Sequence, residues 1–264
     1  MSTILDKIIQ HKRIEVEVLY KTAEALQLIN KSLDTHTSNM SFINKLEQSP
    51  CLEIIAEIKR GSPSKGLFAP TLDVQSVAKE YTDNGASAIS VLTDKEFFYG
   101  SYKNLELARS TSPLPLLCKD FIIDEIQIAI AKAKGANLIL LIANALDRKK
   151  LKALLASVRT HNMEVLVEIH NIEEYKKVAD LDFRLLGINN RDLKTFNTDI
   201  RTSLELAPII KKDNRFIISE SGIHTSLDAE ILAGAGIDGL LVGESLIRSH
   251  NRKELLNSLR IKKG

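Results

Sequence analysis

Short apolar runs alternate with helix-like segments along most of this chain of 264 residues. From residue 52 onward, eight runs rich in Leu and β-branched residues are each followed by a segment of good helix formers at helical spacing, the first run being LEIIAEI and the last IDGLLVG. Several helix-like segments end in glycine before the next run, at Gly85, Gly135 and Gly236. Near-continuous apolar strands that alternate with helices predict a parallel sheet with a covered outer face.

Eight such units favour a closed (β/α)₈ barrel, the TIM barrel, which usually needs about 250 residues. An open, doubly wound α/β sheet is the structural alternative, but the Gly-x-Gly-x-x-Gly signature that often follows its first strand is absent. No composition shift or Pro/Gly-rich linker divides the chain. We therefore expect a single domain over 1–264, with an N-terminal helical extension over 1–50 and the barrel over 51–264.

The extension predicts two helices before the first strand. Ser2 or Thr3 can cap the first helix, whose apolar residues recur at helical spacing as far as Ile29. Ser41 can cap a second, short helix that stops near Pro50.

Composition excludes several classes of protein. The 36 basic and 34 acidic residues give a net charge of +2, which argues against nucleic acid as the main partner. Two cysteines, Cys51 and Cys118, fit neither a disulfide framework nor a zinc site. The N-terminus lacks a secretory signal, and the longest apolar run, ANLILLIANAL, is too short to span a bilayer. We expect a cytoplasmic monomer with no membrane or nucleic-acid partner.

Polar residues collect where the expected strands end, and in a barrel those ends surround the active site. Glu57 and Lys59 are two residues apart at the end of the first strand, so both can face the barrel mouth while Ala56 and Ile58 face the helices. A lone charged residue after a strand is usually only solvated. Here many converge, which indicates a site. The polar residues that end later strands are Lys119, Glu168, Asn189, Arg191, Glu220 and Ser221.

A phosphate site is expected at the late strands, because late βα loops of barrels often bind phosphate through backbone N–H groups and a short helix N-terminus. Gly222 follows the seventh strand, and Gly243 with Glu244 follows the eighth. Ser62 lies in the loop GSPSKG, which we expect to be mobile and to close over the phosphate while Lys59 adds charge. The expected partner is thus a small phosphorylated substrate.

The charged residues expected at the barrel mouth predict general acid–base catalysis. Lys119 and Lys59 are expected to be neighbours; like charge and desolvation lower a lysine pKa, whereas Glu57 opposes that shift. Lys119 could then donate a proton, and Glu168, on the opposite side of the substrate, could accept one. No metal-ligand cluster or dinucleotide motif is apparent, so we expect chemistry without metal or cofactor.

Seven segments, in order across nearly the whole chain, resemble the indole-3-glycerol phosphate synthase family: AEIKRGSPSKG, VLTDKEFFYGS, CKDFIIDEIQI, LVEIH, GINNRDLKTF, SESGI and LLVGESL. The resemblance implies a (β/α)₈ barrel behind a helical extension. It implies a cofactor-free carboxy-lyase of tryptophan biosynthesis. That enzyme converts 1-(2-carboxyphenylamino)-1-deoxyribulose 5-phosphate to indole-3-glycerol phosphate, CO₂ and water.

The resemblance also implies residue roles. Lys119 would protonate the substrate carbonyl as the ring closes, Glu168 would be its counterpart in the dehydration, and Lys59 would share acid duty. Glu57 and Asn189 would hold Lys119 and the reacting hydroxyls. The resemblance further implies that Arg191 or Lys59 binds the anthranilate carboxylate, and that the aromatic ring lies in an apolar slot formed by Phe98, Phe121, Ile142 and Leu241. It implies that the phosphate is bound by Ser62, Gly222, Gly243 and Glu244, and that the sugar is contacted by Glu220 and Ser221.

Four further residues have a structural interpretation. Cys118 and Gly61 depart from the family pattern, in which Arg or Met and Ala are common. We expect Cys118 to be packed against the helices and Gly61 to loosen the first loop. His170 and His224 are expected to be loop or cap residues.

Three alternative functions remain open at this stage. Lys119 could form a Schiff base, as in aldolases. The chain could be a phosphoribosylanthranilate isomerase, which is expected to use an acid and a thiol, although both cysteines are poorly placed. It could also be a non-catalytic barrel that binds a phosphorylated metabolite.

Overall fold

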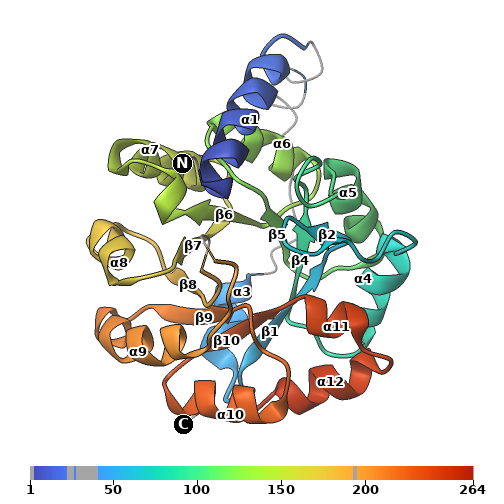
Figure 1. Cartoon of the computed structure of the whole chain (residues 1–264), viewed down its shortest axis with the longest axis vertical. Helices are drawn as coiled ribbons and strands as arrows, with labels where there is room; N and C mark the ends of the chain where they lie inside the picture. The colour runs from blue at the N-terminus through green and yellow to red at the C-terminus, as the bar shows by residue number, and fades with distance from the viewer. Residues whose placement is uncertain (1–2, 23–26, 28–40, 193–194, 264) are drawn as a thin grey trace.

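The computed structural model describes residues 3–22, 27, 41–192 and 195–263. Its centre is a closed barrel of parallel strands in the order β1-β10-β9-β8-β7-β6-β5-β4, closed because β1 pairs with both β4 and β10 (Figure 1). The TIM-barrel prediction is thus confirmed, and the open-sheet alternative is wrong. The barrel strands are β1 (Glu53–Ile58), β4 (Ala88–Leu92), β5 (Leu116–Lys119), β6 (Leu138–Ile142), β7 (Glu164–Ile169), β8 (Leu185–Asn189), β9 (Phe216–Glu220) and β10 (Gly239–Val242).

Helices follow every barrel strand and surround the ring (Figure 1). Their starts are set by side-chain caps such as Asp73, Asp124 and Asp147, which accept hydrogen bonds from the first turn. The helices are α4 (Val74–Asp83), α5 (Tyr102–Thr111), α6 (Glu125–Ala133), α7 (Arg148–Thr160), α8 (Ile172–Val178), α9 (Arg201–Ile210), α10 (Ser226–Gly234), α11 (Glu244–Arg248) and α12 (Arg252–Leu259).

The hydrophobic core has two layers, because successive strand residues face opposite sides. Ala56 and Ile58 of β1 join the layer between strands and helices, as predicted, and so does Ile54, while Ile55 joins the barrel interior. The interior also contains Leu117, Leu140, Leu166, Leu185 and Ile218.

The second helix of the extension, α3 (Phe42–Gln48), closes the end of the barrel where the strands begin. Its side chains Phe42 and Leu46 join the interior cluster, and Ser41 caps it as predicted. Glu164, the first residue of β7, accepts hydrogen bonds from the backbone of Phe42 and Ile43. The cavity described below lies at the other end, where the strands finish.

The first helix, α1 (Ile4–Leu19), begins with a capping box between Thr3 and Asp6, which confirms one of the two predicted caps. Ile29 lies outside the described residues. Val16 and Leu19 pack against α6, next to which α1 lies in Figure 1. None of the helices in the described ranges has the length and apolarity that crossing a lipid bilayer would require.

The loop after β1 contains regular structure that the sequence analysis did not predict. It forms an antiparallel hairpin of β2 (Gly61–Ser62) and β3 (Gly66–Leu67). A Cβ atom at position 61 would lie 2.4 Å from Cδ2 of Tyr99 and 2.6 Å from the carbonyl oxygen of Gly66. Gly61 therefore allows close packing of the hairpin, a role that differs from the loosening that we expected.

Replacing Gly61 by alanine is expected to lower the free energy of unfolding by about 1–3 kcal/mol, because the added methyl group meets backbone as well as Tyr99. Thermal unfolding measures the effect. Gly234→Ala in α10 is the matched control, since a Cβ there would meet nothing within 4 Å. Equal melting temperatures for Gly61→Ala and the unchanged chain would contradict this packing role.

Candidate active site

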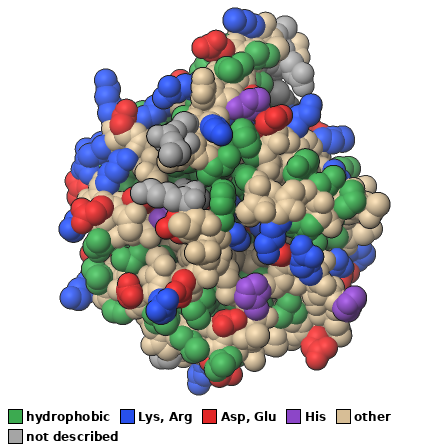
Figure 2. All heavy atoms as spheres, viewed as in Figure 1, with side chains coloured by type: hydrophobic (Ala, Val, Ile, Leu, Met, Phe, Trp, Pro, Cys, Tyr) green, Lys and Arg blue, Asp and Glu red, His purple; other side chains and the backbone are tan. Residues whose placement is uncertain are grey.

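A cavity of about 360 Å³ opens where the barrel strands end. Figure 2 shows this face, with basic side chains gathered beside its central hollow. All residues that the sequence analysis assigned to the site line this cavity: Glu57, Lys59, Ser62, Phe98, Lys119, Phe121, Ile142, Glu168, Asn189, Arg191, Glu220, Ser221, Gly222, Leu241, Gly243 and Glu244. The fold thus brings together residues from all parts of the barrel.

Lys119, the last residue of β5, lies between two carboxylates. Its Nζ is 2.7 Å from Oε2 of Glu168 in β7 and 2.9 Å from Oε2 of Glu220 in β9. We expected Glu168 on the opposite side of the substrate from Lys119, and the direct ion pair corrects that expectation. A proton donor and two proton acceptors therefore form one connected group.

The charge balance around Lys119 also differs from the prediction. Burial disfavours its ammonium form, but the carboxylates of Glu168, Glu220 and Glu57 outweigh burial and raise the pKa of Lys119 above its ordinary value. Lys59 is instead paired with Glu57, the two atoms Nζ and Oε1 being 2.6 Å apart. Lys119 is thus held as an ammonium, the form that can donate a proton.

The two partners of Lys119 titrate differently. Desolvation favours the neutral acid in both, but Lys119, His170 and a hydrogen bond from Asn189 lower the pKa of Glu168 below its ordinary value. Desolvation raises the pKa of Glu220 to about 7; Lys119 opposes this shift, and the Glu168 carboxylate reinforces it. Among the described residues, Oε1 of Glu220 has no hydrogen-bond partner. Glu220 is therefore the carboxyl group of this cluster that can carry a proton near neutral pH.

Glu220→Gln is expected to gain stability relative to the unchanged chain as pH rises from 4.5 to about 7. Glutamate ionises at its ordinary value of 4.5 when unfolded and at about 7 when folded. Folding therefore takes up a proton in this window, and the unchanged chain loses stability as pH increases. Glutamine binds no proton, so the difference should grow by about 1–3 kcal/mol.

Urea unfolding of both chains at acidic and slightly alkaline pH measures this difference. Glu173→Gln removes an exposed glutamate of α8 and serves as the control. Parallel pH dependences of Glu220→Gln and the unchanged chain would show that Glu220 ionises normally.

His170 lies directly after β7, the loop position that we expected, and it also joins the charged network around Lys119 and Glu168. Its Nε2 lies 3.4 Å from Oε1 of Glu168, and its Nδ1 lies 3.1 Å from Oε2 of Glu174. Burial lowers the pKa of His170, but the two glutamates more than offset this and raise it. Strand alternation could have found this residue, because position 170 is two residues after Glu168, as Lys59 is after Glu57.

Asn189 orients Glu168 rather than Lys119. Its side chain hydrogen-bonds Glu168, and its Oδ1 accepts a bond of 3.0 Å from the backbone N–H of Arg191. Nη1 of Arg191 donates to the carbonyl of Phe196 at 3.3 Å. Phe196, the last residue of the segment GINNRDLKTF, and Thr198 also line the cavity, although we expected no role for either.

The glycines that follow the last two strands, Gly222 and Gly243, both line the cavity. Gly222 has a positive φ of 77°, and a Cβ at Gly243 would lie 2.3 Å from Oε1 of Glu57. The Glu244 carboxylate forms an ion pair with Lys65 of the hairpin, Oε1 and Nζ being 2.7 Å apart. Lys65 is a cavity residue that the sequence analysis missed.

Apolar side chains line another part of the cavity. The rings of Phe98 and Phe121 have their centroids 5.9 Å apart, in a tilted arrangement. Leu5 and Ile8 of α1 also line the cavity. The sequence analysis gave the extension no part in the site, because a contact between α1 and the barrel mouth leaves no local pattern.

Neither cysteine faces the cavity. Cys118 is fully buried in the layer between strands and helices, and burial raises the pKa of its thiol to about 12. Cys51 forms a β-bridge with Lys262, just before β1 begins. The prediction that Cys118 is packed against the helices is confirmed. The isomerase alternative requires a thiol in the active site, and no cysteine is among the described residues that line the cavity.

Comparisons with known proteins find relatives over nearly the whole chain. The family model for indole-3-glycerol phosphate synthase matches residues 5–259. The chain is 43% identical to the indole-3-glycerol phosphate synthase of Bacillus cereus, covering 99% of both chains. It is 45% identical to that of Prochlorococcus marinus, covering 97% of this chain and 88% of the relative, and 41% identical to that of Staphylococcus aureus, covering 99% and 98%.

Solved structures with a similar backbone include 3-hexulose-6-phosphate synthase, with a TM-score of 0.64 and 13% identity over 81% of this chain and 100% of that chain. A 3-keto-L-gulonate-6-phosphate decarboxylase from Vibrio cholerae has a TM-score of 0.60 and 17% identity, over 79% and 95%. At such low identity these likenesses support the barrel fold alone.

Proposed function

The chain belongs to the indole-3-glycerol phosphate synthase family, and from this membership we propose how its residues divide the work of the reaction. It is a carboxy-lyase of tryptophan biosynthesis. The substrate is 1-(2-carboxyphenylamino)-1-deoxyribulose 5-phosphate, and the products are indole-3-glycerol phosphate, CO₂ and water. The observation that carries the assignment of roles is the buried Lys119, held as an ammonium between Glu168 and Glu220 inside one cavity.

The substrate is bound by its two ends. The phosphate lies at Gly222, Gly243 and the backbone of Glu244, covered by Ser62, while Lys59 and Lys65 supply positive charge. The anthranilate ring lies among the apolar side chains Phe98, Phe121, Ile142 and Leu241, and Arg191 or Lys59 meets its carboxylate. Fixing both ends presses the ring carbon against the carbonyl carbon, which lowers the entropy cost of closure.

Lys119 acts at ring closure. A bond forms between the ring carbon that bears the carboxylate and the carbonyl carbon, and the carbonyl oxygen takes a proton from Lys119. CO₂ then leaves without its bonding electron pair, which restores the aromatic ring. Glu57 and Asn189 keep the acid and its carboxylate partner in place.

Dehydration completes the indole. The new hydroxyl leaves as water with a proton from an acid, for which Lys59 shares the duty with Lys119. Glu168 accepts the proton that the neighbouring carbon loses. Glu220 and Ser221 contact the sugar. Because the pKa of Glu220 is about 7, this side chain can also hold a proton between ring closure and dehydration.

Indole fluorescence tests the function directly. Purified protein mixed with the carboxyphenylamino sugar phosphate should produce indole emission and release CO₂. Borohydride added during turnover should leave no covalent adduct on Lys119, whereas a Schiff-base mechanism would give one. Binding of the substrate without any emission would favour the non-catalytic alternative and reject catalysis.

We also propose that the chain acts as a monomer in the cytoplasm, as one domain, without cofactor, nucleic acid or membrane. The near balance of charge, with 36 basic and 34 acidic residues, supports the absence of a nucleic-acid partner. Sedimentation velocity at the assay concentration tests the oligomeric state.

A further inference from the structure

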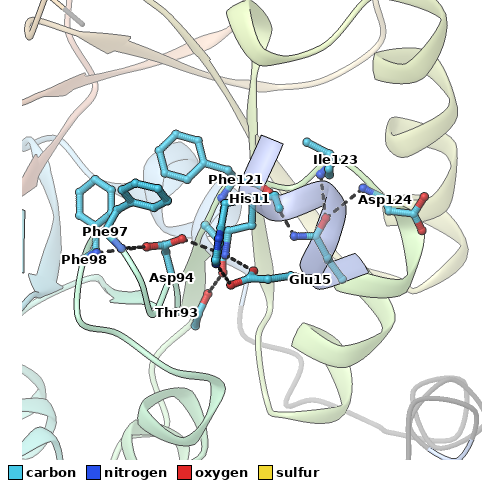
Figure 3. A network of polar contacts seen from close by, with 12 residues as sticks. His11, Glu15, Thr93, Asp94, Phe97, Phe98, Phe121, Ile123 and Asp124 are labelled. Atoms are coloured by element: carbon cyan, nitrogen blue, oxygen red, sulfur yellow. Dashed lines mark hydrogen bonds and ion pairs between the residues drawn. The ribbon is translucent and has the colours of Figure 1, made fainter. Parts of the chain in front are cut away.

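A lysine of the N-terminal helix is buried against the ends of two barrel strands. Lys12 is only 2% exposed. Its Nζ lies 2.9 Å from Oδ2 of Asp94, which follows β4, and 2.9 Å from Oδ1 of Asp120, which follows β5. Glu15 of the same helix is a third partner, at 2.7 Å. Figure 3 shows the network that these groups form.

The two aspartates also hold the backbone that carries the apolar slot. Oδ1 of Asp94 accepts a hydrogen bond of 3.1 Å from the N–H of Phe98, and Oδ1 of Asp120 accepts one of 2.8 Å from the N–H of Phe121. Oγ1 of Thr93 donates to Asp120 at 2.6 Å, which links the ends of the two strands. The backbone of both phenylalanines is therefore held by carboxylates that form ion pairs with Lys12. Figure 3 shows Asp94 beside Phe98, with Phe121 nearby.

Neutralisation matters because both aspartates are deeply buried. Asp94 is 0% exposed and Asp120 is 3% exposed. Without the ammonium, two like charges would remain out of water at the same place, which is strongly unfavourable. They would turn apart, admit water or take up a proton, and each of these changes disturbs the N–H groups that they hold. Asp120 also directly follows Lys119 in the chain, so a displacement of Asp120 would move Lys119 relative to Glu168 and Glu220.

We propose that Lys12 is a positioning residue for the aromatic end of the substrate, and that α1 completes the active site by fixing Asp94 and Asp120 and, through them, the Phe98–Phe121 pair. This inference rests on the proposed function, in which that pair receives the anthranilate ring. The phosphate end, formed by the hairpin and the last two strands, does not contact Lys12 through any of these bonds and should be independent of it.

Lys12→Met tests the proposal, because methionine keeps the length of the side chain without its charge. Arg13→Met is the matched control, since it removes an exposed positive charge from the next position of the same helix. Anthranilate probes the aromatic end, and inorganic phosphate probes the other end. Lys12→Met should weaken anthranilate binding about tenfold or more, consistent with displaced contacts, and change phosphate binding by less than about twofold. Arg13→Met should change neither.

Two results would overturn the proposal: unchanged anthranilate affinity in Lys12→Met, or an equal loss of both affinities, which would mean a merely structural role. Phe98→Ala separates this failure from failure of the slot assignment. If Phe98→Ala binds anthranilate normally, the slot is elsewhere and the proposed function needs revision. Should Lys12→Met not fold, Lys12→Gln, which keeps a hydrogen-bond donor, provides the same comparison.

Discussion

Lys119→Ala is expected to lower kcat by about 10²- to 10⁴-fold, the usual contribution of a general acid. The variant lacks the only atom of this side chain that can protonate the substrate carbonyl. Indole fluorescence at saturating substrate measures the loss. Lys79→Ala removes an exposed lysine of α4, paired only with Asp83 among the described contacts, and should leave kcat unchanged.

The Lys119 variant needs a check on folding, because removal of the ammonium leaves Glu168 and Glu220 buried with like charge. Circular dichroism and inorganic phosphate binding supply that check. A folded variant that binds phosphate and turns over at nearly the normal rate would remove Lys119 from the mechanism.

Glu168→Gln is expected to lower kcat by about 10²-fold or more, because an amide cannot accept the proton released in the dehydration. The change conserves shape, and the amide oxygen can still accept a hydrogen bond from Lys119. A loss of kcat with little change in KM would therefore report lost chemistry rather than lost binding.

Glu173→Gln, on the exposed surface of α8, is the control for the Glu168 variant. Normal kcat in Glu168→Gln would assign proton acceptance to Glu220, the other carboxylate on Lys119. Normal kcat in both the Lys119 and the Glu168 variants would reject the proposed division of roles.

The sequence predicted the elements well, because strands and helices leave short-range patterns. Thr3 and Ser41 were recognisable as caps, and Gly85 has the positive φ of 87° expected after a helix. The gathering of the site residues was also predictable, since parallel strands of a barrel end at one face.

The sequence did not predict which site residues touch. The ion pair between Lys119 and Glu168 depends on side-chain conformations and on the width of the barrel, neither of which has a local signature. Lys12 was missed for a related reason. In HKRIEVE it stands among other charged residues, and only its contacts with Asp94 and Asp120, which follow β4 and β5, distinguish it from the exposed Arg13.

The hairpin after β1 shows a further limit. Glycine, serine and proline in GSPSKG predicted a mobile loop but gave no sign of the hairpin, in which Gly61 lies close to Tyr99. Tyr99 is distant in sequence, so the space available at Gly61 could not be read from the neighbouring residues.

The Lys65–Glu244 ion pair joins the loops of the first and last strands across the seam where the ring closes. Lys65 is 46% and Glu244 is 20% exposed, so water and dissolved ions can reach the pair. In the proposed binding mode, the substrate phosphate competes with the Glu244 carboxylate for the Lys65 ammonium. The rate of substrate binding should then depend on ionic strength through two opposed effects, because salt weakens the Lys65–Glu244 ion pair and also weakens the attraction between Lys65 and the phosphate.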